Sequence, residues 1–399
     1  MASLTSTSAP SWKRLTVLLS VTLISGFNQG LLLPLLAILL EQQGVSSDMN
    51  GLNSMALYIG TFGMMFFIEK PIRRFGYKAG ILAGIALAGT ATLLFPVFSG
   101  ALWIWFILRI AVGIGDSALH YCAQLWIVSS ASPQRRGRVI SLYGMAYGIG
   151  FSLGPIGINL ANAASWMPFA LNAALFVLVA FFMLPLGREY PEAAKSSAES
   201  GNRFWLVYRL GWFALLPAIL YGLLESTMNS NFPLYGLRIG LSKETISMLL
   251  PALGIGSLVV MFPLGILSDR IGRKRVLMGC ALSAGLVFFA VPLAGSQVPL
   301  LFVLLSLVGG LVGSFFSLGL AYAGDVLPRN LLPSANVIAS IHFSIGSLLG
   351  PSVGGASIQY VSTQSVFLLL GGAFALFALL GPLFRSAGGE AAVNSNSVV

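Results

Sequence analysis

The ionisable residues inside one apolar segment, residues 102–127, are the first candidates for chemistry. At spacings of 7, 4 and 4 residues, a helix places four polar side chains near one stripe: Arg109, Asp116, His120 and Gln124. Asp116 and His120 lie one turn apart and can share a proton, because imidazole titrates near neutral pH and burial shifts a carboxyl toward the same range. We therefore predict proton coupling by this pair; a structural hydrogen bond between helices is the alternative for each residue.

A second carboxyl, Glu225, lies in the polar stretch 224–231 of another apolar segment. Ionisable residues in the middle of a membrane span are costly to bury, so each is a functional hypothesis by default. Glu225 is the other candidate for protonation, again with a helix-to-helix hydrogen bond as the alternative. Amide and aromatic side chains on the same segments are predicted to line a substrate cavity: Asn28, Gln29, Tyr121, Gln124, Asn229 and Asn231.

The elements that hold these side chains must be membrane helices, because the composition excludes a soluble protein. The 399 residues are 56% hydrophobic and only 9% charged, against about 25% charged in a typical soluble domain. Apolar runs that are long enough to span a bilayer recur along the chain. In lipid, a helix pairs its backbone N–H and C=O groups internally, so we expect each run to be helical. We predict an all-α membrane protein with twelve transmembrane helices, near 15–40, 50–68, 79–98, 102–127, 139–161, 164–187, 210–236, 244–267, 276–294, 299–323, 334–356 and 363–384.

The positions of the 22 Lys and Arg residues predict the orientation of these helices. With the amino terminus in the cytoplasm, 19 basic residues lie inside, Arg238 and Lys243 lie outside, and Arg109 lies within a span. This asymmetry predicts a multi-pass plasma-membrane protein with both termini cytoplasmic. The net charge of +10 is then explained by membrane orientation and does not indicate a nucleic-acid partner. The loops carry no Walker motif, so we expect an ion or substrate gradient to supply the energy.

Enzymatic and metal chemistry are not expected from this sequence. Cys122 and Cys280 both fall in apolar runs, where small buried thiols are the ordinary interpretation. The chain has no C-x-x-C metal spacing and no visible nucleophile–base constellation. We therefore predict no metal site, no cofactor and no catalytic residue.

Glycine landmarks at one offset indicate an internal repeat. Gly76 and Gly272 lie 196 residues apart, as do the Gly-Pro pairs that begin at Gly154 and Gly350. Two landmarks at one offset predict duplicated six-helix halves, as in two-lobed transporters. The predicted organisation is an N-terminal lobe at 1–187, a cytoplasmic linker at 188–203, a C-terminal lobe at 204–385 and a cytoplasmic tail at 386–399.

Residues 265–275 (GILSDRIGRKR) resemble the cytoplasmic signature of the major facilitator superfamily, G-x-x-x-D-R-x-G-R-K/R. The first-half counterpart departs from it, with Glu69 and Arg73 where glycine and aspartate are expected. Residues 109–115 resemble the superfamily's helix-4 arginine motif, which implies a role for Arg109 in proton coupling. The resemblance implies a cytoplasmic gate that latches the outward-facing state, formed by Gly265, Asp269, Arg270, Gly272 and Arg273.

The glycine–proline motifs also resemble superfamily motifs, and a complete copy stands at residues 346–355. Proline removes a helical hydrogen bond, and neighbouring glycines permit bending and close packing. We predict helix hinges, with simple tight packing as the equal alternative, at Gly154, Pro155, Gly350 and Pro351.

Together these features predict a proton-coupled secondary transporter that works by alternating access and resembles the twelve-helix drug and metabolite proton antiporters. The predicted cavity is modestly polar, which favours export of an amphipathic or cationic small organic molecule. Proton-symport uptake of a small metabolite, and a lipid or glycolipid flippase of the same fold, are the alternatives. The expected partners are the small-molecule substrate, protons and membrane lipids, and the expected state is a monomer.

Overall fold

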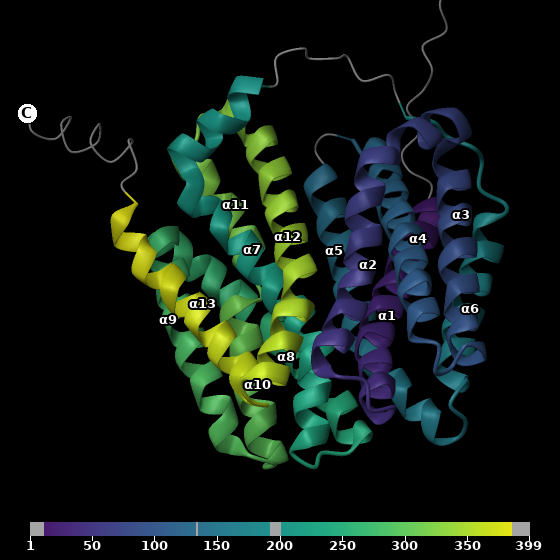
Figure 1. Ribbon diagram of the computed structural model, residues 1–399. Helices are drawn as coiled ribbons and strands as arrows, with labels where there is room; N and C mark the ends of the chain where they lie inside the picture. The colour runs from purple at the N-terminus through teal and green to yellow at the C-terminus, as the bar shows by residue number, and fades with distance from the viewer. Residues whose placement is uncertain (1–11, 133–134, 192–200, 385–399) are drawn as a thin grey trace, which may run out of the picture. The chain divides into compact units, whose positions relative to one another are not determined.

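The computed structural model describes residues 12–132, 135–191 and 201–384, and this part of the chain is helical with no strand (Figure 1). Its α-helices are α1 (Trp12–Gln42), α2 (Ser47–Phe67), α3 (Glu69–Val97), α4 (Leu102–Ser129), α5 (Arg136–Leu153), α6 (Met167–Met183), α7 (Gly201–Arg238), α8 (Lys243–Ile271), α9 (Arg273–Ala290), α10 (Val298–Val312), α11 (Phe315–Val326), α12 (Leu332–Tyr360) and α13 (Ser365–Leu380). Short 3-10 turns continue four of them: η1 (Gly154–Asn162), η2 (Val291–Ala294), η3 (Arg329–Leu331) and η4 (Gly381–Leu383).

Ten helices in the described ranges are long and apolar enough to cross a membrane. Two further predicted spans do not reach that standard: α2 begins with a polar stretch, and α6 has only 17 residues. The predicted span 299–323 falls within one of the ten, Val298–Val326, in which α10 ends at Val312 and α11 begins at Phe315. The all-helical membrane fold is confirmed, whereas the count of twelve spans stays a prediction.

The described chain forms two compact units. One contains residues 12–36 and 56–191, and the other contains residues 37–55 and 201–384. Residues 37–55 therefore group with the later helices, although the predicted N-terminal lobe includes them. α7 begins at Gly201, inside the predicted linker; the rest of that linker after residue 191, and the predicted tail, lie outside the described residues.

Glycines allow α1 and α5 to cross with their backbones in contact. A methyl group at Gly26 would clash with the Tyr147 carbonyl, and one at Gly150 would clash with the Leu23 carbonyl. Small residues of this kind are the usual means of close helix packing in membranes. The crossing brings the polar residues of α1 beside those of α5.

The same backbone contacts recur 196 residues later, within the other unit. Four glycines and their carbonyl partners each have a counterpart at that offset. The paired contacts are Gly26–Tyr147 and Gly222–Phe343, Gly150–Leu23 and Gly346–Ile219, Gly60–Ile110 and Gly256–Ser306, and Gly113–Leu57 and Gly309–Leu253. The offset that the sequence shows therefore relates equivalent packing contacts as well as similar residues.

Gly76 and Gly272 also play matching roles in the backbone. Gly76 has φ +83° and interrupts α3, while Gly272 has φ +95° and separates α8 from α9. These angles lie in the left-handed region that glycine adopts without strain. The two landmarks thus mark equivalent turns.

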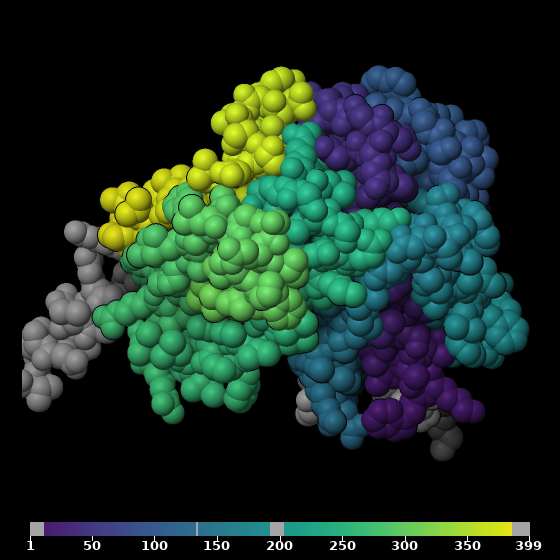
Figure 2. Space-filling model, turned by 90° about the horizontal axis from the view of Figure 1, so that it is seen from below, coloured from purple at the N-terminus to yellow at the C-terminus, as the bar shows by residue number. Residues whose placement is uncertain are grey.

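The corner between α1 and α2, residues 37–55, is attached to α7 by an arginine. Arg238 donates from Nε to Glu41 Oε1 at 2.7 Å and from Nη2 to Ser47 Oγ at 2.6 Å. Figure 2 shows this face, on which the purple corner adjoins the surface of the later helices. Arg238 is one of the two basic residues predicted to lie outside. Its ion pair with Glu41 explains why a basic residue occurs at this point of the chain.

α12 contributes three more contacts to the corner. The Tyr360 hydroxyl donates to Asp48 Oδ2 at 2.9 Å, and the Ser47 N–H donates to Gln359 Oε1 at 3.0 Å. Gly355 packs so closely on the Ser47 carbonyl that a methyl group would not fit. The corner is therefore held by charge, hydrogen bonds and direct backbone packing.

Arg238→Met is expected to loosen the corner and to expose the buried Ser54 position of α2. The test uses a background protein in which Cys122 and Cys280 are replaced by serine and Ser54 by cysteine. Adding Arg238→Met to this background should make an impermeant thiol reagent react with the cysteine at position 54 about three to five times faster. A partly exposed ion pair contributes little by itself, which limits the expected change. Lys243→Met is the matched control. Equal rates in the two variants would show that the ion pair does not hold the corner.

Candidate functional site

Asp116 is completely buried on α4, and neighbouring glycines create its surroundings. A methyl group at Gly113 would clash with the Leu57 carbonyl of α2. One at Gly115 would lie 2.7 Å from the Gly84 carbonyl of α3. The glycines of the arginine motif thus let two helices close on α4 beside the carboxyl.

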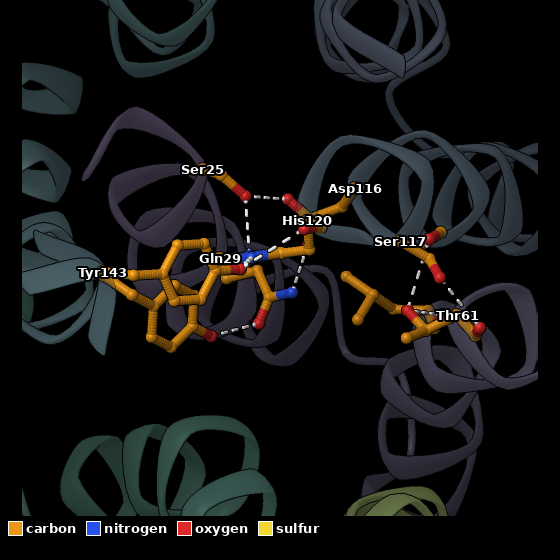
Figure 3. Close-up of polar contacts among 10 residues, drawn as sticks. Ser25, Gln29, Thr61, Asp116, Ser117, His120 and Tyr143 are labelled. Atoms are coloured by element: carbon orange, nitrogen blue, oxygen red, sulfur yellow. Dashed lines mark hydrogen bonds and ion pairs between the residues drawn. The ribbon is translucent and has the colours of Figure 1, made fainter. Parts of the chain in front are cut away.

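Two residues of α1 hydrogen-bond the Asp116 carboxylate (Figure 3). Ser25 donates from Oγ to Oδ1, and Gln29 donates from Nε2 to Oδ2. Ser25 and Gln29 lie one helical turn apart, so a single face of α1 supplies both donors. Both carboxylate oxygens of Asp116 therefore have a hydrogen-bond donor from α1.

His120 extends the network toward α5. Its Nε2 lies 2.9 Å from Ser25 Oγ and 3.7 Å from Asp116 Oδ2, and its Nδ1 lies 2.6 Å from the Tyr143 hydroxyl. Because the single Ser25 proton is directed at Asp116, the His120 Nε2–H donates to Ser25. Nδ1 of a neutral ring then accepts from Tyr143. These hydrogen bonds form a chain from Tyr143 through His120 and Ser25 that ends at the Asp116 carboxylate.

Tyr147 closes the network from the next turn of α5. Its hydroxyl donates to Gln29 Oε1 at 2.9 Å, which leaves the Gln29 amide nitrogen directed at Asp116. The Tyr147 ring meets His120 edge-on, with ring centroids 4.9 Å apart, and lies 5.8 Å from the ring of Phe151. Aromatic surface therefore borders the polar cluster.

The two titratable side chains of the cluster differ in their access to water. The Asp116 side chain is 1% exposed, whereas the His120 side chain is 22% exposed. The cluster therefore pairs an imidazole that water can reach with a carboxylate that is shielded from water.

The other predicted residues of α4 lie elsewhere on the helix. Arg109 is buried within electrostatic reach of Tyr58 on α2. Tyr121 is 36% exposed, and Gln124 is also exposed. The structure thus joins Asp116 and His120 in one network but does not extend it to Gln124. The role of Arg109 in proton coupling stays a prediction.

The predicted cavity amides make contacts within the helical packing. Asn172 of α6 donates to Asn28 Oδ1, and both residues are buried. Asn229 donates to the Glu225 carbonyl at 2.8 Å, and Asn231 donates to the Pro351 carbonyl at 3.2 Å. Gln29 differs from these three amides because it donates to a titratable side chain, that of Asp116.

Arg273 organises the residues predicted to form the cytoplasmic gate. It donates from Nη2 to Asp269 Oδ1 at 2.9 Å and from Nη1 to Asp325 Oδ1, so it links α8, α9 and α11. Arg270 is exposed. A methyl group at Gly265 would meet no described atom within 4 Å. The latch itself stays a prediction.

Asp325→Asn is expected to lower the melting temperature by about 2 °C, because Arg273 then loses the partner that joins α9 to α11. Arg270→Gln, which removes an exposed charge from the same segment, should change it by less than about 1 °C. Differential scanning fluorimetry of the purified protein measures both. A larger loss for Arg270→Gln would contradict the assigned role of Arg273.

The two glycine–proline motifs differ in their helical geometry. α5 ends at Leu153, and Gly154 and Pro155 begin the 3-10 helix η1. α12, by contrast, continues through Gly350 and Pro351. Both motifs lie against neighbouring helices, which agrees with tight packing; the hinge motion stays a prediction.

Sequence reasoning missed three members of the cluster: Ser25, Tyr143 and Tyr147. The available signal was spacing, because Ser25 and Gln29 are four residues apart and Tyr143 and Tyr147 are also four apart. Nothing in the sequence, however, pairs the first apolar segment with the fifth. That pairing depends on the glycine crossing of α1 and α5.

An all-helical membrane protein with ionisable side chains buried between its helices is typical of membrane transport proteins rather than of enzymes. The chain belongs to the Major Facilitator Superfamily, whose family model matches residues 18–242 and 206–397.

Curated relatives cover most of the chain. An uncharacterized MFS-type transporter of Bacillus subtilis (strain 168), YfkF, is 38% identical over 360 residues, which cover 89% of this chain and 91% of that protein. YcaD of Salmonella enteritidis PT4, also an uncharacterized MFS-type transporter, is 23% identical over 362 residues, with the same coverages of 89% and 91%.

Solved structures share the fold at low sequence identity. The nucleoside transporter NupG has a TM-score of 0.76 at 15% identity and covers 93% of this chain and 98% of its own. The D-xylose–proton symporter has a TM-score of 0.74 at 16% identity, with coverages of 93% and 97%. At such identity the likeness shows the fold alone.

Proposed function

We propose that this protein is a proton-coupled secondary transporter that exports an amphipathic or cationic small organic molecule by alternating access. One observation carries the proposal: the buried Asp116 carboxylate accepts hydrogen bonds from Ser25 and Gln29 and lies next to the partly exposed His120. A membrane protein tolerates such a buried carboxyl at a cost of a few kcal/mol, which indicates a functional reason for its presence.

Protonation changes the hydrogen bonds around Asp116. The ionised carboxylate accepts from two donors, whereas the neutral acid must itself donate one hydrogen bond. Ser25 or Gln29 must then reorient, and Tyr147 is connected to Gln29 by its hydroxyl. A proton at Asp116 therefore alters contacts between α1 and α5. We propose that this change biases the transporter between its two conformations.

The aromatic border of the site supports an amphipathic substrate. Tyr147 and Phe151 present rings beside the polar cluster, and such rings bind apolar and cationic organic groups. Export, a plasma-membrane location with cytoplasmic termini, and a monomeric state are parts of the same proposal. A flippase of the same fold is the alternative that lipid scrambling would reveal.

Uptake by proton symport is the second candidate, favoured by the solved structures. These structures are of a nucleoside transporter and a D-xylose–proton symporter.

Proteoliposomes with an imposed pH gradient distinguish the candidates. The probes are ethidium, uridine, D-xylose and a fluorescent phospholipid, and an internal pH dye records the proton flux. Antiport predicts ethidium movement opposite to the proton flux. Uridine or xylose movement with the protons would establish symport, and scrambling of the phospholipid without a gradient would establish the flippase.

A further inference from the structure

Glu225 on α7 differs from Asp116 because its carboxylate has no hydrogen-bond or ion-pair partner in the described ranges. Asn229 hydrogen-bonds the backbone carbonyl of Glu225 rather than its side chain. Glu225 itself is only partly exposed, in the middle of a helix long and apolar enough to cross a membrane. A carboxylate in such surroundings requires either a proton or a positively charged ligand.

The internal repeat indicates which residues surround Glu225, because each position can be compared with the one 196 residues earlier. Glu225 is the counterpart of Gln29, 196 residues later. Three of the polar residues around Gln29 have aromatic counterparts in this half, whereas Asp116 and Tyr143 correspond to Val312 and Ala339. The substitutions at that offset are Ser25 by Tyr221, His120 by Phe316, and Tyr147 by Phe343.

The ring contacts confirm that these counterparts are arranged alike. His120 and Tyr147 meet edge-on in the first unit, with centroids 4.9 Å apart, and Phe316 and Phe343 meet edge-on with centroids 6.0 Å apart in the second. The backbone contact of Gly26 with Tyr147 likewise recurs between Gly222 and Phe343. The second unit therefore keeps the edge-on pair of side chains, with Phe316 in place of His120 and Phe343 in place of Tyr147.

The three rings form a connected group that includes the helical turn before Glu225. Tyr221 lies one turn before Glu225, and its ring lies 5.9 Å from that of Phe343. Phe343 in turn contacts Phe316 of α11. Tyr221, Phe316, Phe343 and Glu225 are all partly exposed rather than buried, so a ligand can reach them.

We propose that Glu225, Tyr221, Phe316 and Phe343 form a binding site for the cationic group of an organic substrate. The carboxylate supplies the opposite charge, and the ring faces supply cation–π and apolar contacts suited to a quaternary ammonium or phosphonium group. As a substrate site, it rests on the proposed function of a transporter for amphipathic cations. Glu225 then binds the ligand, and Asp116 and His120 handle the proton.

The test measures binding of tritiated tetraphenylphosphonium to the purified protein in detergent, without any gradient. Glu225→Gln is expected to weaken binding at least tenfold, and Phe343→Leu about threefold, since the first removes the charge and the second one ring. Glu69→Gln and Phe302→Leu are the matched controls. They remove an exposed carboxylate and an exposed ring, and both should bind as the wild type does.

A neutral ligand of similar shape distinguishes recognition of the positive charge from nonspecific apolar binding. The wild type should bind tetraphenylphosphonium at least tenfold more tightly than triphenylphosphine oxide, and Glu225→Gln should abolish that preference. Unchanged tetraphenylphosphonium affinity in correctly folded Glu225→Gln would overturn the proposal and favour a proton at Glu225. Phe343→Leu provides an independent result if the first variant does not fold.

The binding assay also separates this site from the proposed transport activity. If tetraphenylphosphonium binding depends on Glu225 but no pH gradient drives its movement, the cation site stands and proton-coupled export fails. If a gradient drives its movement while Glu225→Gln binds normally, export stands and this site fails.

Discussion

Asp116→Asn is expected to abolish transport driven by a pH gradient while leaving ligand binding largely intact. Asparagine keeps the size of the side chain, and its amide oxygen can still accept from Ser25. It cannot bind or release a proton, so substrate movement is no longer tied to the proton gradient. We expect gradient-driven ethidium transport in proteoliposomes to fall at least tenfold, with ethidium affinity changed by less than about threefold.

The measurement needs a control for charge and a control for the network. Glu69→Gln removes an exposed carboxylate that pairs with Arg73 and should transport normally. His120→Gln should slow transport less than Asp116→Asn, because it removes the exposed end of the network but leaves the buried carboxyl. Normal gradient-driven transport by Asp116→Asn would refute proton coupling at this site.

Gly150→Ala is expected to destabilise the protein more than any surface substitution, although it adds only one methyl group. That methyl group would clash with the Leu23 carbonyl of α1, and a backbone oxygen cannot move aside without shifting its helix. Overpacking of this kind costs about 1–3 kcal/mol. We expect the melting temperature to fall by about 1–4 °C, and the fraction of monodisperse protein to fall with it.

Gly148→Ala supplies the control on the same helix, two residues away. A methyl group at Gly148 meets no described atom within 4 Å, and alanine is the better helix former by up to about 1 kcal/mol. Its melting temperature should therefore be unchanged or slightly higher. Equal losses for both variants would show that helix propensity, and not the α1–α5 crossing, explains the effect.

The crossing also affects function, because it sets the distance between donor and acceptor. Ser25 and Gln29 reach Asp116 from α1, and Tyr147 reaches Gln29 from α5. If α1 and α5 separate, the hydrogen bond between Tyr147 and Gln29 is lost. A Gly150→Ala protein that still folds should therefore also lose part of its proton coupling, which the proteoliposome assay detects.

The membrane-embedded carboxyls of the two units, Asp116 and Glu225, illustrate how a repeat diverges. Around Asp116, serine, glutamine and histidine supply hydrogen bonds. In the second unit the counterparts of Ser25 and His120 are the rings of Tyr221 and Phe316, and the counterpart of Gln29 is Glu225 itself. The same scaffold therefore creates one site suited to a proton and, in our proposal, another suited to an organic cation.

The sequence by itself determined the membrane class, the family and the candidate carboxyls, because each depends on local properties. Hydrophobic length, scarcity of charge and signature spacing are visible without any tertiary contact. The spacing of Asp116 and His120 likewise predicted that they would meet, since a helix fixes neighbours four residues apart. The offset of 196 residues predicted the repeat for the same reason.

Only the tertiary structure decided which helices share these side chains. It joined Ser25 and Tyr143 to the cluster, placed Asn28 and Asn231 in packing contacts, and grouped residues 37–55 with the later helices. It also showed that Asp325 is a partner of Arg273. Such pairings depend on which backbone surfaces fit together, and glycine positions show where a close approach is possible without showing which helix fills it.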